Sequence, residues 1–482
     1  MYQLSTTTMF LYIVIAFVIS IWYVIRHWNL LKLIVKCIYA YIRCPGRGLE
    51  LLGMFQDAFP DIFRVRFSIK TVYVLAKPEY YEKVLSSPLA VDKPEVYTLL
   101  DQFLGPNIFT AAENLWRQQR RLLNLSFSQK RIDSHSEIFL EEADNLAKEL
   151  VTHASQKNLD LEGLMRVCFA QATARALFGV KFKVTVEDSR KMDRIFIETA
   201  RRGVHLFYVP SILMPPMPKA FNKSLSDAII ASKSIIFERR KQLVRNKTLL
   251  QDDKPQTERA QKSHMLDYIL ECPEFTDERA MSEIILFLIA GNETSSATLM
   301  YACLLLAMHP DIQEKLYHDV VSICGLDDPI TLEKLPKIDY AERIIKETLR
   351  LFPSAPIIGR YTQGDLDIGG RVIPKHSTVY LHIVYTHRDP RFWQEPLTFD
   401  PDRFLQENAS KIYPFSYIPF SYGSRNCIGL RFAMTSIKIA LVNLIRKVKV
   451  FTDYKSVEDV KLKAHFLLRP RDGWKLRFEA RN

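Results

Sequence analysis

Hydrophobic positions recur along most of the chain with the spacing of a helix. Residues 138–153 repeat apolar side chains every three or four positions with acids and lysines between them, and residues 430–448 do the same. Residues 281–308 form a longer apolar helical stretch, and a helix over residues 340–352 is stopped by Pro353. Helices therefore make up most of the predicted structure.

Strand patterns are fewer and shorter. Alternating apolar and polar residues, or runs rich in β-branched side chains, predict strands in four places. These places are residues 63–67, 72–76, 370–374 and 378–383. Prolines make residues 210–218 a loop, and the aperiodic polar stretch 246–264 predicts a flexible surface connection. No linker or repeat divides the rest, so we expect one mainly α domain with a small β-sheet region.

The first 25 residues carry a different pattern. No charged side chain precedes Arg26, and residues 9–25 are an almost unbroken apolar run, near the ~17–25 residues that cross a bilayer. A cleaved signal peptide would have a basic segment before the run and a small-x-small site after it, and neither is present. The charged residues from Arg26 to Arg47 are all basic. Because basic residues stay on the cytosolic side of a membrane, the N-terminus is expected to face the lumen. We expect a signal-anchor transmembrane helix (1–25), a basic juxtamembrane linker and hinge (26–47) and one cytosolic domain (48–482).

Net charge and cysteine spacing exclude some classes of function. The 482 residues carry a formal net charge of +12, spread along the chain without a long basic run. Such charge suits anionic lipid headgroups or an acidic protein partner, but no base-reading motif accompanies it, so we expect no nucleic-acid binding. The seven cysteines are scattered and form no Cys-x-x-Cys pair. This argues against a disulfide framework or a zinc site, and for a reducing compartment.

One cysteine stands in a segment with chemistry of its own. The segment reads PFSYGSRNCIG and ends at Gly429, just before the helix predicted for residues 430–448. Unpaired N–H groups at that helix end favour a thiolate at Cys427, and a thiolate is a strong axial ligand for haem iron. Glycine lets backbone lie close to a flat macrocycle, Phe420 can shield the sulfur, and Arg425 can bind a carboxylate. The alternative for a lone cysteine is an inert buried thiol.

This segment resembles the Phe-x-x-Gly-x-Arg-x-Cys-x-Gly signature of the cytochrome P-450 enzymes, and five fixed positions make a chance match rare. Glu347 and Arg350 resemble the family's Glu-x-x-Arg motif, and Arg403 lies in a segment similar to its second arginine motif. Alone, the first two would be an ordinary surface ion pair. In the family, the three groups form a buried network whose role is structural.

The long apolar helix contains a second resemblance. Residues 290–294 read AGNET, similar to the family's Ala-Gly-x-Glu-Thr. This implies catalytic roles for Thr294 and Glu293 in handling the protons of oxygen reduction; the alternative is a core helix whose threonine bonds to its own backbone. Gly291 weakens a helix, and we attribute it to a local opening for dioxygen. Ala290 stands where many fatty-acid omega-hydroxylases carry a haem-esterifying glutamate, so covalent haem attachment is not expected.

The remaining cofactor contacts are also implied by the resemblance. Trp116 and Arg120 are similar to the family's Trp-x-x-x-Arg and share one helix face, so both can reach a haem propionate. Arg360 falls where many relatives place another propionate-binding arginine. The expected haem contacts are Trp116, Arg120, Arg360, Phe420, Arg425 and Gly429, and the expected metal ligand is Cys427.

The resemblance covers nearly the whole chain and implies the mostly helical cytochrome P-450 fold with bound haem b. It implies a monooxygenase that hydroxylates or epoxidises a hydrophobic substrate with one oxygen atom from O2. Electrons would come from NADPH through NADPH-cytochrome reductase, with a b-type cytochrome as a second donor. The detailed sequence of residues 107–121 and 415–429 is similar to that of the animal microsomal clan that includes fatty-acid omega-hydroxylases. That clan implies a single-pass protein of the endoplasmic reticulum membrane with a cytosolic catalytic domain.

Three alternatives remain open. A peroxide isomerase of the same fold needs no reductase, but such relatives typically lose the threonine that is present here as Thr294. The others are a non-catalytic haem- or lipid-binding membrane protein and a mitochondrial form, which would need an Arg-rich amphipathic presequence. An apolar pocket is predicted, which favours a lipid, hydrocarbon or xenobiotic. Its expected lining is 107–110, parts of 207–217, Phe287, Leu288, 357–358 and 465–467.

Overall fold

The computed structural model describes residues 48–67, 70–98, 100–153, 159–181, 183–205, 216–249, 264–464 and 466–481. The predicted signal-anchor helix (1–25) and juxtamembrane linker (26–47) lie outside these ranges. Among the residues that are described, no helix combines the length and the apolar character that crossing a bilayer requires.

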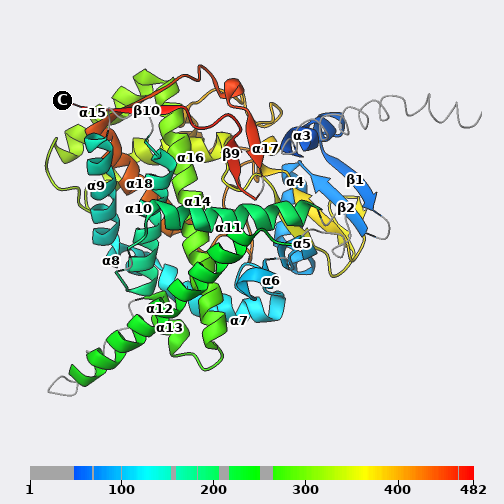
Figure 1. Cartoon of the computed structure of the whole chain (residues 1–482). Helices are drawn as coiled ribbons and strands as arrows, with labels where there is room; N and C mark the ends of the chain where they lie inside the picture. Colours follow the sequence, from blue (N-terminus) through cyan, green and yellow to red (C-terminus); the bar gives the residue numbers. More distant parts are fainter. Residues whose placement is uncertain are drawn as a thin grey trace, which may run out of the picture.

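Helices form most of the described chain (Figure 1). The longest, α14 (Asp277–Met308), runs through the middle of the molecule and packs against α10 (Leu161–Thr173) and α18 (Leu430–Lys447). The other α-helices are α3 (Gly48–Ala58), α4 (Pro78–Ser86), α5 (Glu95–Thr98), α6 (Asp101–Leu104), α7 (Glu113–Leu123), α8 (Gln129–Ser134), α9 (Ser136–Thr152), α11 (Val186–His205), α12 (Lys219–Leu249), α13 (Met265–Leu270), α15 (Pro310–Cys324), α16 (Asp339–Leu351) and α17 (Ile383–Thr386). Short 3₁₀ helices occupy Pro88–Ala90, Asn124–Phe127, Leu335–Lys337, Pro401–Phe404, Gln406–Lys411 and Val457–Asp459, and a π-helical turn, Ala174–Phe178, continues α10.

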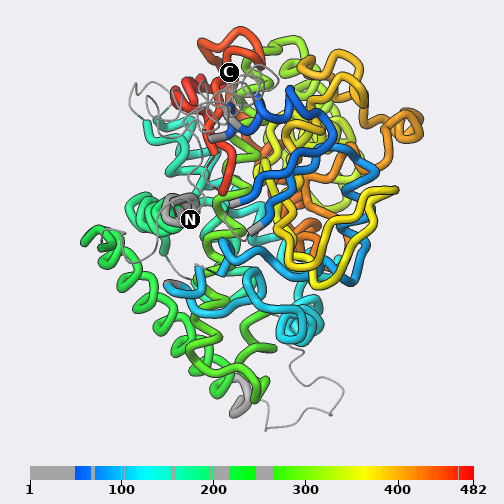
Figure 2. Tube along the Cα trace, turned by 90° about the vertical axis from the view of Figure 1, so that its right-hand side faces the viewer, coloured from blue at the N-terminus to red at the C-terminus, as the bar shows by residue number. Residues whose placement is uncertain are grey.

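The strands of the described chain form one four-stranded sheet and three two-stranded sheets. The largest sheet has the order β1 (Ile62–Phe67), β2 (Lys70–Leu75), β6 (Thr378–Leu381) and β3 (Ile358–Tyr361), in which β2 and β6 are parallel and the other neighbours antiparallel. Figure 2 shows the early strands, in blue, beside the later strands, in yellow. Two-stranded sheets pair β4 (Leu366–Asp367) with β5 (Val372–Ile373), β7 (Val448–Thr452) with β10 (Leu476–Ala480), and β8 (Leu462–Ala464) with β9 (Leu468–Pro470).

The sequence of α14 explains its central place. From Ile284 to Ile289 every side chain is buried, so this part of the helix has no solvent face. A helix that is apolar all round is stable only when other elements cover it on all sides. Its start lies four residues before the predicted residue 281, because the Thr276 hydroxyl accepts the Arg279 N–H at 3.3 Å and caps a polar first turn.

The predicted mainly α domain with small sheets is confirmed. The helices expected at 138–153 and 340–352 are α9 and α16, and the four predicted strands correspond to β1, β2, β5 and β6. One prediction is wrong: residues 246–249 continue α12 instead of beginning a loop. A helix that has already formed adds further residues at little cost, and lysine and leucine are good helix formers. The rest of that stretch, 250–263, lies outside the described ranges.

Candidate active site

The cysteine segment is a tight turn directly before α18. The Cys427 N–H donates to the Phe420 carbonyl oxygen at 2.9 Å, which closes the turn that carries the sulfur. Gly423 has a φ of 73° and lies so close to Leu85 that any Cβ would overlap the Leu85 carbonyl. Glycine is therefore required at residue 423 both by the backbone conformation and by this close approach.

The sulfur of Cys427 is accessible from a cavity inside the protein. Burial raises the pKa of the Cys427 thiol, and the Gly429 N–H and the Arg120 guanidinium only oppose this shift. The N–H contribution predicted from the helix end is thus present, but desolvation outweighs it. A Cβ at Gly429 would meet Cys427 Sγ at an ordinary 3.9 Å, so no protein atom requires glycine there.

The cavity has a volume of about 330 Å³ and mostly apolar walls. Its walls come from α14, from α18, from the segment before α7 and from the chain around β3 and β9. A larger hollow of about 530 Å³ lies beside Phe404, but it is lined by neither a cysteine nor an arginine. The cavity at Cys427 is therefore the candidate site.

Four basic side chains gather at one part of this cavity or directly behind its wall, and we call them the basic cluster: Lys93, Arg120, Arg360 and Arg425. None of the four forms an ion pair with a carboxylate in the part of the chain that the structure describes. Burial lowers the pKa of Arg425 to about 9 and that of Arg360 to about 10. Burial, followed by repulsion from Arg360 and Arg425, holds the pKa of Lys93 well below its usual range.

Two arginines of the basic cluster tie the cysteine segment to distant parts of the chain. Arg120 donates from Nη1 and Nη2 to the backbone and side-chain oxygens of Asn426, both at 2.8 Å. Arg425 donates to the carbonyl oxygens of Val91 at 3.1 Å and of Ile108 at 3.3 Å, and also to that of Ala111. Its guanidinium lies 4.4 Å from the centre of the buried Trp116 ring, a favourable cation–π distance.

The predicted Arg360 lies one layer further from the cavity. It does not line the cavity but donates from Nη2 to the hydroxyl of Ser421, which does. Lys93, in contrast, lines the cavity and was missed by the sequence analysis, because it belongs to none of the motifs. Trp116, Phe420 and Gly429 line the cavity together with Arg120 and Arg425.

The α14 residues predicted to be catalytic lie at the same cavity. Thr294 and Ala290 line it, and the Thr294 hydroxyl donates to the Ala290 carbonyl oxygen at 2.7 Å. This is the backbone-bonded arrangement considered as an alternative, but a donating hydroxyl keeps lone pairs that can accept a further hydrogen bond. A Cβ at Gly291 would lie 2.8 Å from Thr173 Oγ1 of α10. Close packing of α14 on α10 is therefore a reason for this glycine besides the predicted opening.

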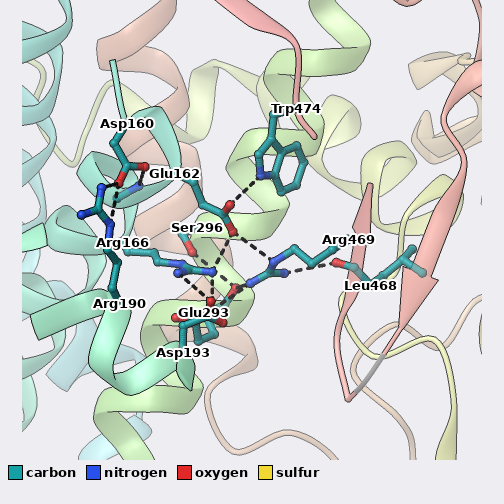
Figure 3. A network of polar contacts seen from close by, with 11 residues as sticks. Asp160, Glu162, Arg166, Arg190, Asp193, Glu293, Ser296, Leu468, Arg469 and Trp474 are labelled. Atoms are coloured by element: carbon teal, nitrogen blue, oxygen red, sulfur yellow. Dashed lines mark hydrogen bonds and ion pairs between the residues drawn. The ribbon is translucent and has the colours of Figure 1, made fainter. Parts of the chain in front are cut away.

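Glu293 lies in a network of acids and arginines drawn from separate elements (Figure 3). Its Oε2 is 2.8 Å from Arg469 Nη2 of β9 and 3.2 Å from Arg166 Nη2 of α10. Arg166 also pairs with Asp193 of α11 at 3.2 Å and with Glu162 at 2.7 Å. Burial raises the pKa of Glu293 to about 7, although the two arginines oppose the shift. Its carboxyl group can therefore gain or lose a proton near neutral pH.

The predicted network of Glu347, Arg350 and Arg403 is confirmed. Arg350 donates from Nε and Nη2 to the two carboxylate oxygens of Glu347 at 2.7 Å, and both side chains are fully buried. Arg403 Nε lies 3.4 Å from Oε1 of the same carboxylate. The remaining donors of Arg350 reach the carbonyl oxygens of His387, Pro396 and Thr398.

Comparison with known proteins identifies the family. The family profile described as Cytochrome P450 matches residues 40–478. The chain belongs to the cytochrome P450 family. It is 29% identical over 434 residues to Cytochrome P450 4c3 of Drosophila melanogaster, covering 85% of this chain and 80% of the relative. It is 28% identical over 421 residues to Cytochrome P450 4V2 of Homo sapiens (85% and 80%), and 30% identical over 473 residues to Probable cytochrome P450 4ac3 of Drosophila melanogaster (94% and 88%). The family recognised from the motifs is thus confirmed, and this cytochrome P450 is an enzyme of the monooxygenase class.

The cytochrome P450 family implies a haem-thiolate cofactor, and the residues present fit one. The Cys427 sulfur is accessible from the cavity, so it could bind the iron of a haem there, and the mostly apolar walls suit a flat macrocycle. The basic cluster holds buried positive charge that forms no ion pair within the described chain, which costs free energy unless an anion neutralises it. Two haem propionates would supply that negative charge.

Most of the predicted substrate lining lies at the cavity. The residues of that prediction that line it are Ile108, Phe109, Phe287, Ile357, Ile358, Phe466 and Leu467. Leu288 instead belongs to the hydrophobic core. Asn107 and Thr110 are buried, and both form hydrogen bonds within their own turn. Residues 207–215 and 465 lie outside the described ranges.

Proposed function

We propose that this cytochrome P450 is a haem-dependent monooxygenase that inserts one oxygen atom from O2 into a hydrophobic substrate, by hydroxylation or epoxidation. The observation that carries the proposal is the cavity in which the Cys427 sulfur, apolar walls and the unpaired basic cluster meet. We propose haem b as the cofactor and Cys427 as its axial ligand. Its proposed contacts are Trp116, Arg120, Arg360, Phe420, Arg425 and Gly429, with Lys93 added from the structure.

The protein's own residues would position the substrate and move protons. When bound, haem supplies the redox chemistry that activates dioxygen. Thr294, whose hydroxyl can still accept a hydrogen bond, would hold a proton at the cavity. Glu293 suits the role of proton relay, because a group with a pKa of about 7 exchanges protons readily near neutral pH. Arg166 and Arg469, which bind its Oε2, would control how freely the carboxyl group turns.

The proposed substrate is a lipid, a hydrocarbon or a xenobiotic. The cavity walls formed by Ile108, Phe109 and Phe287 support this class, because burial of apolar surface is what they offer a ligand. Fatty-acid derivatives are the first compounds to screen.

The electron donors and the location are also part of the proposal. We propose electron transfer from NADPH through NADPH-cytochrome reductase, with a b-type cytochrome as a possible second donor; the net charge of +12 supports acidic partners. The apolar run 9–25, followed by basic residues to Arg47, supports a single-pass anchor in the endoplasmic reticulum membrane with the catalytic domain (48–482) in the cytosol.

The test is the carbon-monoxide difference spectrum of the reduced, full-length protein. We expect a long-wavelength Soret band in the wild type and none in Cys427→His, because only a thiolate ligand produces that band. Cys272→Ser, at a partly exposed cysteine that does not line the cavity, is the matched control and should keep the band. A wild type that binds haem without the band, or binds none, would contradict the proposal.

A second measurement separates the monooxygenase from an isomerase of the same fold. The monooxygenase should oxidise its substrate only with NADPH and the reductase. Turnover of a fatty-acid hydroperoxide without NADPH and reductase would favour the isomerase instead. The presence of Thr294 at the cavity is the observation that argues for the monooxygenase.

A further inference from the structure

A short turn, residues 107–110, forms part of the cavity wall. Ile108 and Phe109 both line the cavity. Within the turn, Asn107 Oδ1 accepts the N–H groups of Phe109 at 3.0 Å and Thr110 at 3.3 Å. The turn belongs to no helix or strand, so its position in the wall depends on what holds it from outside.

Two consecutive residues of α14 hold this turn. The Ile108 N–H donates to Glu283 Oε1 at 2.8 Å, a contact between residues 175 positions apart. Next to it, Ser282 packs against Gly105, which has a φ of 73° and where a Cβ would overlap the serine hydroxyl. Glycine at residue 105 therefore lets the chain approach α14 closely enough for Glu283 to reach Ile108.

The same residue of the turn is also held from the other side. Arg425, in the cysteine segment, donates from Nη1 to the Ile108 carbonyl oxygen at 3.3 Å. Ile108 therefore connects Glu283 on α14 with the segment that carries Cys427. A displacement of the turn would move the cavity wall, while Arg425 would keep its hydrogen bonds to Val91 and Ala111.

Burying a carboxylic acid at position 283 is energetically unfavourable, because the group loses its hydration. The Glu283 side chain is 0% exposed, and its Oε2 has no hydrogen-bond partner among the described residues. Burial raises the pKa of Glu283 to about 8, and the Ile108 N–H and Arg279 only oppose this shift. An apolar residue would avoid the desolvation, but it would leave the buried Ile108 N–H without an acceptor. The hydrogen bond to Ile108 is thus the reason we find for the acid.

We propose that Glu283 is a positioning residue for substrate selection, which fixes the Ile108 peptide and thereby the wall formed by Ile108 and Phe109. It acts through the turn and does not line the cavity itself. The proposal rests on the haem site of the proposed function, because the wall selects ligands that approach the haem. Its effect should therefore appear in ligands that reach the wall, and not in ligands that touch the iron alone.

Two ligands of haem iron separate these effects. Imidazole reports on the iron alone, whereas 4-phenylimidazole also brings a ring against the cavity wall. Both are titrated into the full-length holoenzyme and followed by the Soret shift. Glu283→Asp shortens the side chain by one methylene, and Glu283→Gln keeps its reach and one oxygen acceptor. Glu278→Asp, at an exposed glutamate in the first turn of α14, is the matched control.

We expect Glu283→Asp to bind 4-phenylimidazole about tenfold more weakly while its affinity for imidazole changes by less than about twofold. Glu283→Gln and Glu278→Asp should bind both ligands as the wild type does. Equal 4-phenylimidazole affinity in all four proteins overturns the proposal. Parallel weakening of both ligands in Glu283→Asp also overturns it, because that result indicates general damage to the haem site.

Amide hydrogen exchange provides a second readout, which needs no ligand. In the wild type we expect the Ile108 amide to exchange at least as slowly as those of Phe109 and Thr110; rapid exchange at Ile108 alone overturns the proposal. In Glu283→Asp, but not in Glu283→Gln, the Ile108 amide should exchange faster. The carbon-monoxide band of the wild type keeps the two proposals apart: its absence contradicts the proposed function, while the exchange result still decides the role of Glu283.

Discussion

Buried charge is arranged in two contrasting ways in this cytochrome P450. Around Glu347, every charged group has a protein partner: Arg350 and Arg403 surround one carboxylate, and backbone carbonyl oxygens take the other donors of Arg350. In the basic cluster, three cations line the cavity and Arg360 lies behind them, and within the described chain none of the four pairs with a carboxylate. The Glu347 network is neutralised within the protein, whereas the basic cluster forms no ion pair within the described chain, as expected of a site for an anion.

The contrast is the one expected between groups that hold the fold and groups that bind a cofactor. A paired buried network is neutralised during folding, so losing one partner leaves the others desolvated and unpaired. An unpaired cluster carries its desolvation cost until a ligand arrives, and binding then returns stability to the folded state. Substitutions in the two regions should therefore differ in sign, and not only in size, when the cofactor-free protein is examined.

The largest effect is expected in the Glu347 network. Glu347→Gln leaves Arg350 buried beside a neutral amide and should destabilise the folded protein by about 3–5 kcal/mol, with or without haem. Denaturant unfolding measures the change. Lys346→Gln on the same helix removes a partly exposed ion pair with Glu342, which keeps its ion pair with Lys438, and should cost under about 1 kcal/mol. Equal losses in the two variants would show that the network is not structural.

The basic cluster should respond in the opposite direction. Lys93→Met removes one repelled cation, so the haem-free protein should be as stable as the wild type or more stable, while haem affinity falls about tenfold. Thermal unfolding of the haem-free protein and haem transfer to an apoprotein acceptor measure the two quantities. Lys83→Met, at an exposed lysine of α4, should change neither. A destabilised haem-free Lys93→Met protein with normal haem affinity would remove the contrast.

Glu293 lies between the two cases, because it has two arginine partners and still a pKa raised to about 7. The folded protein keeps a proton there that the unfolded chain releases above its ordinary value of 4.5. The stability contributed by this group is therefore present below about pH 4.5 and is lost as the pH rises through about 7. Between pH 5 and 6, the free energy of unfolding of the wild type should fall relative to Glu293→Gln by about 1 kcal/mol. A difference that does not change with pH would argue against the proton-relay role.

The smallest effect is expected at the surface. Arg481 and Lys449 hold the pKa of Glu314 at about 2, below its ordinary value of 4.5. The stabilisation is thus present above about pH 4.5 and is lost as the pH falls through about 2. Because the group is one-third exposed, Glu314→Gln should cost only about 0.5 kcal/mol at pH 7, and less at pH 3. Unfolding free energies at both pH values test this, and a larger loss at pH 3 would contradict it.

Local periodicity and contiguous motifs predicted much of the fold and of the candidate site. α9, α16 and α18 each carry a repeating apolar face, which is enough to predict a helix without knowing its neighbours. Cys427 and Arg425 lie in one motif, and Glu293 and Thr294 lie in another. The start of α14 was missed because its first turn is polar, and the end of α12 was missed because residues 246–249 have no apolar period.

The sequence by itself determined the family and the helical class of this cytochrome P450 and led to the proposal of Cys427 as the haem ligand, because all three depend on residues that are close together in the chain. Only the tertiary structure decided that Lys93 joins three arginines, that Gly291 packs on Thr173 and that Glu283 holds the Ile108 peptide. Such contacts join residues far apart in the chain. They depend on the path of the folded backbone, and no local pattern of hydrophobic and polar residues records that path.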